Sequence, residues 1–245
     1  MRPVPRPRWM PPAYHGEIPS IITNIRQLPS GVAPTLENIP QLDHLMIEDD
    51  PLSSLVWDMQ TTDFKQLGFV IFRTVYTDES QPLWGSYPLL KWTIIEDRET
   101  LDNASKQHVR ERFSEWASQH SVERDGPGVE EALQQKFPRF RYCIYVDKKC
   151  LDTVAKYEAW AEAGAQSVRK KVVCAVLDKN CHRKGEGEGR YRRIEGCSRE
   201  YTGWQYTSVN CLADLYDRLS KQELSGYDYM RPPMVFPADG PMPVD

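Results

Sequence analysis

The pattern of hydrophobic and polar positions changes near residue 67. Before that point, 10 of the 19 prolines lie between Pro3 and Pro51, and apolar residues are few and scattered. Four isoleucines nevertheless cluster between residues 18 and 25, and a solvated linker would have no need of them. Residues 1–66 are therefore interpreted as a proline-rich arm that docks partly on the remainder of the chain.

From residue 67 to residue 237, apolar positions recur with the spacings of strands and helices. Residues 67–76 are apolar on both alternating faces, as in a strand that is covered on both sides. The other elements that we expect are strands at 89–96, 139–147, 170–177 and 203–209, and helices at about 104–119, 129–136, 151–163 and after Asn210. This region is predicted to be the core domain, followed by a short tail at 238–245.

The order of these elements predicts the fold class. Strands and helices neither alternate strictly as βαβ units nor form a series of hairpins, a mixture that is typical of α+β proteins. We therefore expect a largely antiparallel sheet with helices packed on one face. Among such folds, a ferredoxin-like split βαβ arrangement fits the order best.

Composition narrows the class of protein further. The chain has 245 residues, 40% hydrophobic and 27% charged, which is enough to bury a core without disulfides. A formal net charge of -4 disfavours nucleic acid as a partner. No apolar run approaches the roughly 18 to 20 residues of a membrane span, and no secretory leader is evident. With 6 scattered cysteines, read as reduced thiols, the expected location is cytoplasmic.

Two charged residues stand out within the apolar strands. Arg73 follows Phe69 and Ile71 on one face of its strand, and Glu96 follows Ile94 on one face of the next predicted strand. A charged group surrounded by apolar surface must find a partner or reach solvent. If the two strands are neighbours, Arg73 and Glu96 form a buried pair or line a polar pocket at the end of the sheet.

The role of this pair has two interpretations, and both stay open. In the first, Arg73 and Glu96 form a structural ion pair. In the second, Glu96 or Asp97 is a general acid or base, and Arg73 holds an anionic group of the substrate. The candidates for further substrate contacts are Arg98, Asp102, Tyr76 and Tyr145.

Other reactive residue types do not form a recognised site. Cys174, Cys181, His182 and Cys197 are types that zinc binds, but their spacing matches no known zinc motif. The chain has no G-x-S-x-G, H-E-x-x-H or P-loop motif, and the glutamates in 185–189 would repel phosphate. We therefore expect no metal site and no cofactor.

Several blocks of sequence carry a resemblance. They are 68–76 (GFVIFRTVY), 92–102 (WTIIEDRETLD), 121–128 (SVERDGPG), 142–150 (YCIYVDKKC), 194–197 (IEGC), 203–204 (GW) and 231–233 (RPP). In combination they resemble a broad group of functionally uncharacterised fungal proteins, over residues 67–237. The resemblance implies a fungal source and a shared core, and it assigns no catalytic residue. After Tyr76 the chain departs from the pattern, since relatives have a longer helical segment there.

Two functions of different classes follow. The chain is interpreted as a small-molecule-binding or processing enzyme of fungal specialised metabolism, of the isomerase, cyclase or lyase type. The alternative is a non-catalytic interaction or regulatory protein that uses the arm and residues 230–245 as contact segments, which leaves a protein partner or a homodimer open. A deep apolar pocket with converging polar groups would favour the enzyme.

Overall fold

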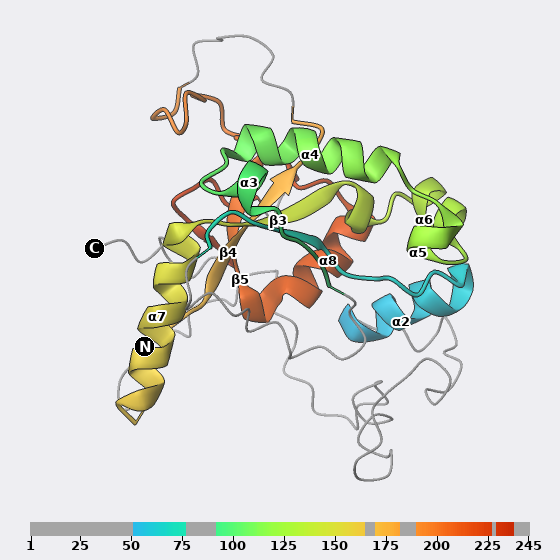
Figure 1. The fold of residues 1–245 in the computed structure, drawn as a ribbon, viewed down its shortest axis with the longest axis horizontal. Helices are drawn as coiled ribbons and strands as arrows, with labels where there is room; N and C mark the ends of the chain where they lie inside the picture. Colours follow the sequence, from blue (N-terminus) through green and yellow to red (C-terminus); the bar gives the residue numbers. More distant parts are fainter. Residues whose placement is uncertain (1–50, 77–91, 165–169, 182–189, 227–228, 238–245) are drawn as a thin grey trace, which may run out of the picture.

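A six-stranded sheet between two layers of helices forms the body of the molecule (Figure 1). The computed structural model describes residues 51–76, 92–164, 170–181, 190–226 and 229–237. Most of the expected arm, residues 1–50, and the expected tail, residues 238–245, lie outside the described residues.

The sheet is mixed, with the strand order β2-β1-β3-β4-β5-β6. Its strands are β1 (Val70–Arg73), β2 (Thr93–Ile95), β3 (Tyr142–Val146), β4 (Val173–Asp178), β5 (Trp204–Ser208) and β6 (Val235–Phe236). Strand β4 is antiparallel to both of its neighbours, β3 and β5. By contrast, β1 is parallel to both β2 and β3, and β6 is parallel to β5. The predicted antiparallel pairing thus holds for the pairs β3–β4 and β4–β5, which join the three longest strands. The other pairs are parallel.

Helices cover both faces of the sheet. They are α2 (Pro51–Thr62), α3 (Arg98–Leu101), α4 (Lys106–Ser118), α5 (Val122–Asp125), α6 (Val129–Gln134), α7 (Lys148–Glu162) and α8 (Leu212–Lys221). Figure 1 shows α4 above the sheet, α2 and α8 below it, and α7 along one side. No helix that the structure describes is long and apolar enough to cross a membrane.

The expectation that helices pack on one face is wrong. Alternate residues of the strands belong to two separate cores: Ile71 and Ile144 pack with residues of α2, α6 and α8, whereas Phe72 and Cys143 pack with residues of α4 and α7. Because both sets of strand side chains are apolar and fully buried, each face needs its own cover of helices. The α+β class is shown, but this arrangement does not confirm a ferredoxin-like fold.

Helix α2 extends the core into the segment that was expected to be the arm. Leu55 and Met59 are buried against the first core cluster, and Phe64, just after the helix, is fully buried. The helix begins at Pro51, a position that suits proline because the first helical N–H has no intrahelical partner. The core therefore includes residues from Leu55 onward.

Candidate functional site

The connections of β1 and β3 leave the sheet in opposite directions. After β1 the chain continues to β2 on one side, and after β3 it continues through α7 to β4 on the other side. In open α/β sheets, the crevice at the carboxyl ends of two such parallel strands is the usual place for a ligand. The ends of β1 and β3 are therefore the first place to look for a site.

Arg73, the last residue of β1, lies beside Glu96. The parallel register pairs Phe72 with Ile95, so the next residue of each strand is adjacent to the other. Arg73 Nη1 lies 2.8 Å from Glu96 Oε1, and Arg73 Nε donates a hydrogen bond to the carbonyl oxygen of Val75 at 3.0 Å. The structure thus brings the two residues together as expected, whereas their catalytic roles stay predictions.

The pair is less buried than the sequence suggested. The side chain of Arg73 is 24% exposed and that of Glu96 is 49% exposed, because β2 is an edge strand. A partly solvated ion pair of this kind adds about 1 kcal/mol or less to stability. Glu96 is accessible to a small molecule at the sheet edge.

The side chain of Asp97 caps the N-terminus of helix α3. It accepts hydrogen bonds from the backbone N–H of Thr100 at 3.3 Å and from the Thr100 hydroxyl at 2.5 Å. The Thr100 hydroxyl is the main cause that lowers the pKa of Asp97. A carboxylate stabilised in its ionised form is a weaker base, so Asp97 suits capping better than proton transfer.

Tyr76 joins these residues through its ring and hydroxyl. Its ring centroid lies 5.0 Å from the guanidinium carbon of Arg73, a distance suited to a cation–π contact. Its hydroxyl accepts a hydrogen bond from the backbone N–H of Asp97 at 2.8 Å. Partial burial raises the pKa of Tyr76, which keeps the phenol neutral at physiological pH.

The remaining predicted contacts are not joined to the Arg73–Glu96 pair. Arg98 and Asp102 lie at the two ends of α3, where both are exposed and form no ion pair within the described residues. Tyr145 packs in the core that contains Phe72 and Cys143, and it is 7% exposed. Its hydroxyl donates to the carbonyl oxygen of Ala104 at 2.9 Å, and burial raises its pKa to about 12.

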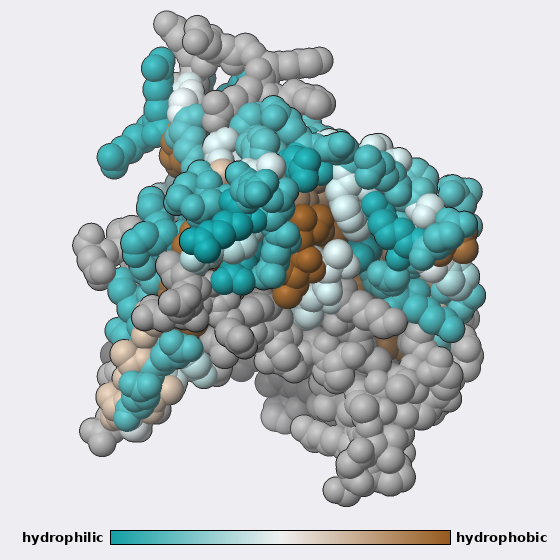
Figure 2. Space-filling view, viewed as in Figure 1, coloured by the Kyte–Doolittle hydropathy of each residue, from teal (hydrophilic) through white to brown (hydrophobic). Residues whose placement is uncertain are grey.

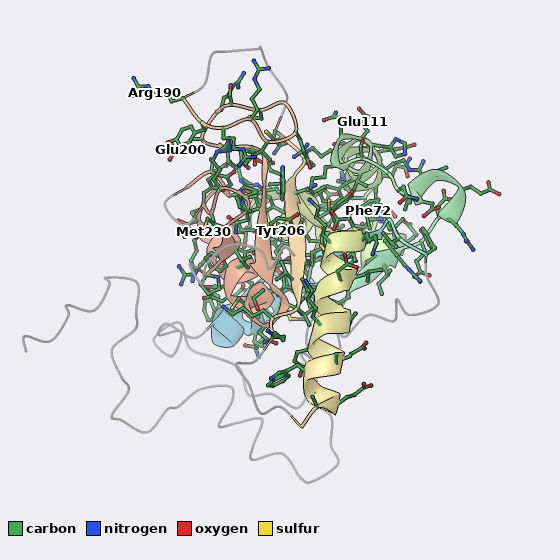
Figure 3. The ribbon with its side chains drawn as sticks, turned by 90° about the vertical axis from the view of Figure 1, so that its left-hand side faces the viewer. Phe72, Glu111, Arg190, Glu200, Tyr206 and Met230 are labelled. Atoms are coloured by element: carbon green, nitrogen blue, oxygen red, sulfur yellow. The ribbon has the colours of Figure 1, made fainter. Side chains whose placement is uncertain are left out.

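A groove runs between the end of β1 and helix α7. Its apolar walls are Val75, Leu151, Val154 and Ala155, and its charged rim is Lys148, Asp152 and Glu158. Figure 3 shows α7 in front of the strands, with its C-terminal end extending past the sheet. The carbonyl group of Val75 is bound by Arg73, so the groove adjoins the predicted site. We call this feature the α7 groove.

Sequence reasoning missed a buried lysine. Lys106 is 7% exposed, and its Nζ lies 2.6 Å from Glu195 Oε1 and 4.1 Å from the ring centroid of Trp204. Tyr145 flanks the same ammonium group at 4.9 Å. Nothing in the sequence indicated this cluster, because Glu195 is 89 residues from Lys106 in a polar stretch.

The cysteines do not assemble a metal site in the described part of the chain. Cys174 is fully buried in β4, and Cys181 and Cys197 are half-buried. Within that part, no group of three histidine, cysteine or acidic side chains could hold a metal ion. His182 lies outside the described residues.

Comparison of the chain with protein-family models, with curated proteins and with solved structures found no match. The resemblance to fungal proteins therefore stays a prediction. What the structure defines is the class of the fold: a three-layer α+β protein with a groove at the carboxyl ends of two parallel strands.

Proposed function

We propose that this chain binds a small molecule in the α7 groove. The observation that carries the proposal is the position of the groove, which lies between Val75, two residues after the end of β1, and the helix that follows β3. That is the crevice where open α/β sheets usually bind ligands. Arg73 and Glu96 do not line the groove, but they are linked to it, because Arg73 binds both the carbonyl oxygen of Val75 and the carboxylate of Glu96.

The lining of the groove indicates the class of ligand. Val75, Leu151 and Ala155 provide apolar walls, which suit a ligand with a hydrophobic body. At the rim, Lys148 lies 2.8 Å from Asp152, and Glu158 adds a second carboxylate. One positive and two negative charges leave the rim with a net charge of about -1, which favours a ligand that carries an amine.

Proton transfer is the proposed chemistry if the ligand is also converted. Glu96 is the better candidate for the acid or base, because half of its side chain is exposed beside Arg73. Asp97, in contrast, is held as a helix cap. An isomerase, cyclase or lyase of fungal specialised metabolism needs a group of this kind, and that assignment rests on the resemblance alone.

A panel of aryl and alkyl amines, with matched carboxylic acids, tests the binding proposal by thermal shift and calorimetry. We expect amines to raise the melting temperature, and acids of the same shape to have little effect. Ala155→Trp fills the groove and should abolish the shift. Ala161→Trp is the matched control, because Ala161 is exposed on the same helix but does not line the groove. If no compound binds, or if both variants bind equally, the proposal is wrong.

Arg73→Ala separates a ligand role from a structural one. A folded variant with altered affinity for the amines would show that the Arg73–Glu96 pair acts on the groove, whereas unchanged affinity would make the pair a structural contact at the sheet edge. Wild-type protein that binds none of the compounds would favour the alternative, a non-catalytic interaction protein.

A further inference from the structure

Strand β2 leaves one edge of the sheet open. Within the part of the chain that the structure describes, β2 pairs with β1 alone, so its outer side carries N–H and C=O groups that the sheet does not use. Ile94, in the middle of β2, is 40% exposed. Figure 2 shows apolar side chains at the surface below α4, where Figure 1 shows the β1–β2 edge of the sheet.

The two edges of the described sheet differ in protection. Strand β6 has two residues, and Pro233 and Pro237 lie close before and after it. Proline beside an edge strand is a common device that prevents edge-to-edge pairing. Strand β2 has neither proline nor charge, and its three residues, Thr93, Ile94 and Ile95, are all β-branched, the type that pairs best in sheets. The β2 edge is therefore suited to pairing.

We propose that β2 pairs in antiparallel fashion with β2 of a second copy of this chain, so that one sheet continues through both copies. The proposal goes beyond the α7 groove and does not depend on it. A strand that pairs with its own copy forms a two-fold interface in which the same residues face each other.

The alternation of side chains restricts the register of this pairing. A two-fold axis perpendicular to the sheet places a given residue on the same face of the sheet in both copies. In an antiparallel pair, two side chains that lie directly opposite each other also share a face. The axis must therefore lie level with one residue, so that this residue faces its own copy, and not level with the peptide bond between two residues. An axis at Ile94 pairs the two copies of Ile94, and pairs Thr93 with Ile95 of the second copy, so that all residues of β2 are used.

The chemistry of β2 favours a copy of itself over a charged partner. Thr93, Ile94 and Ile95 carry no charge, so two copies do not repel each other at the contact. Cross-strand pairs of β-branched residues stabilise antiparallel pairing through their side-chain contacts. A contact this small is well below a standard interface of about 1,600 Å², so we expect a weak dimer that forms only toward the upper end of the accessible protein concentrations.

Sedimentation of the full chain from about 1 to 500 μM tests the proposal. We expect the mass to rise from monomer to dimer, and Ile94→Lys to remain a monomer because it places two like charges opposite each other. Val122→Lys is the matched control, since Val122 is 57% exposed on α5 and should leave the dimer intact. A wild-type monomer throughout, or equal behaviour of the two variants, would overturn the proposal.

Cross-linking tests the register directly. In Ile94→Cys the two thiols meet at the axis, and glutathione disulfide accepts their two electrons and two protons as the sulfur–sulfur bond forms. We expect a covalent dimer of Ile94→Cys on a non-reducing gel and little dimer from Val122→Cys or from wild type. The wild-type protein measures the cross-linking that its own half-buried cysteines cause. Equal yields from all three proteins would contradict the register.

Discussion

Gly128 closes the turn that follows α5 and touches the end of α2. Its φ is +76°, and a Cβ at this position would collide with the carbonyl oxygen of Thr62 and with the backbone of Asp63 and Phe64. Because a backbone cannot give way as a flexible side chain can, Gly128→Ala should lower the free energy of unfolding by about 3 kcal/mol. Urea denaturation followed by circular dichroism measures this loss.

Gly196 provides the matched control for this steric effect. Its φ of +83° is similar, but no atom lies within 4 Å of an added Cβ. Gly196→Ala should therefore cost only the left-handed backbone strain, about 1 kcal/mol. Equal losses in the two variants would show that the contact with α2 contributes nothing.

At the scale of residues, the sequence predicts local chemistry better than distant contacts. The adjacency of Arg73 and Glu96 followed from the alternation of side chains, on the condition that their two strands are neighbours. The contact of Gly128 with α2 and the contact of Lys106 with Glu195 did not, since both join segments far apart in the chain. The same limit applies to the α7 groove, whose walls are separated by more than one element.

Helices α2 and α8 bring two acidic side chains into one interface. Burial, with the nearby Asp217 carboxylate, raises the pKa of Asp58 to about 6, and Lys221 partly offsets this increase. Lys221 Nζ lies 2.9 Å from Asp217 Oδ2, so this ammonium group is already bound to one of the two carboxylates. The packing of α2 therefore depends on the protonation of Asp58.

This pKa predicts how pH changes stability. The ordinary pKa of Asp58 is 3.8, so between about pH 4 and pH 6 the folded chain binds a proton that the unfolded chain has lost. Its contribution to the free energy of unfolding therefore falls as pH rises through this range. Asp58→Asn should remove the fall and stabilise the protein by up to about 3 kcal/mol at pH 7. Urea denaturation from pH 4 to pH 7 measures the difference.

Asp102→Asn is the control for this effect, because Asp102 is exposed. The difference between this control and wild type should stay near zero at every pH. A difference between Asp58→Asn and wild type that does not grow between pH 4 and pH 7 would contradict the raised pKa of Asp58.

At the scale of elements, periodicity placed most helices and strands but not their ends. The helix expected at 104–119 spans Lys106–Ser118, with Ser105 as its cap. The strand expected from residue 139 begins only at Tyr142, because Pro138–Phe140 forms a short helical turn. Helix α2 was missed because the prolines before it resemble an extended segment, although a proline also suits the first position of a helix.

At the scale of the whole molecule, the strand order was the least predictable feature. The residues of β1 indicated cover on both faces, and a sheet covered on both faces implies three layers. Chain order alone does not reveal that β1 lies between β2 and β3. Helices α3, α4, α5 and α6 all lie between β2 and β3 in the chain, and so long a connection can return to the sheet at several positions. Strands β2 and β3 both run parallel to β1, and parallel strands need crossover connections of this kind.

The same strand order predicts which backbone amides exchange with solvent first. Inner strands β3 and β4 are paired on both sides and buried on both faces, so their amides should exchange slowest. Amides of β2 and β6, at the edges, should exchange faster.

If β2 forms the dimer, raising the protein concentration from about 2 to 500 μM should slow exchange in Thr93–Ile95 by mass action and leave Val235–Phe236 unchanged. Hydrogen exchange with mass spectrometry distinguishes the two edges. Exchange in β2 that is independent of concentration would mean that this edge is open but unpaired in solution, whereas slow exchange at every concentration would mean that β2 is not an open edge.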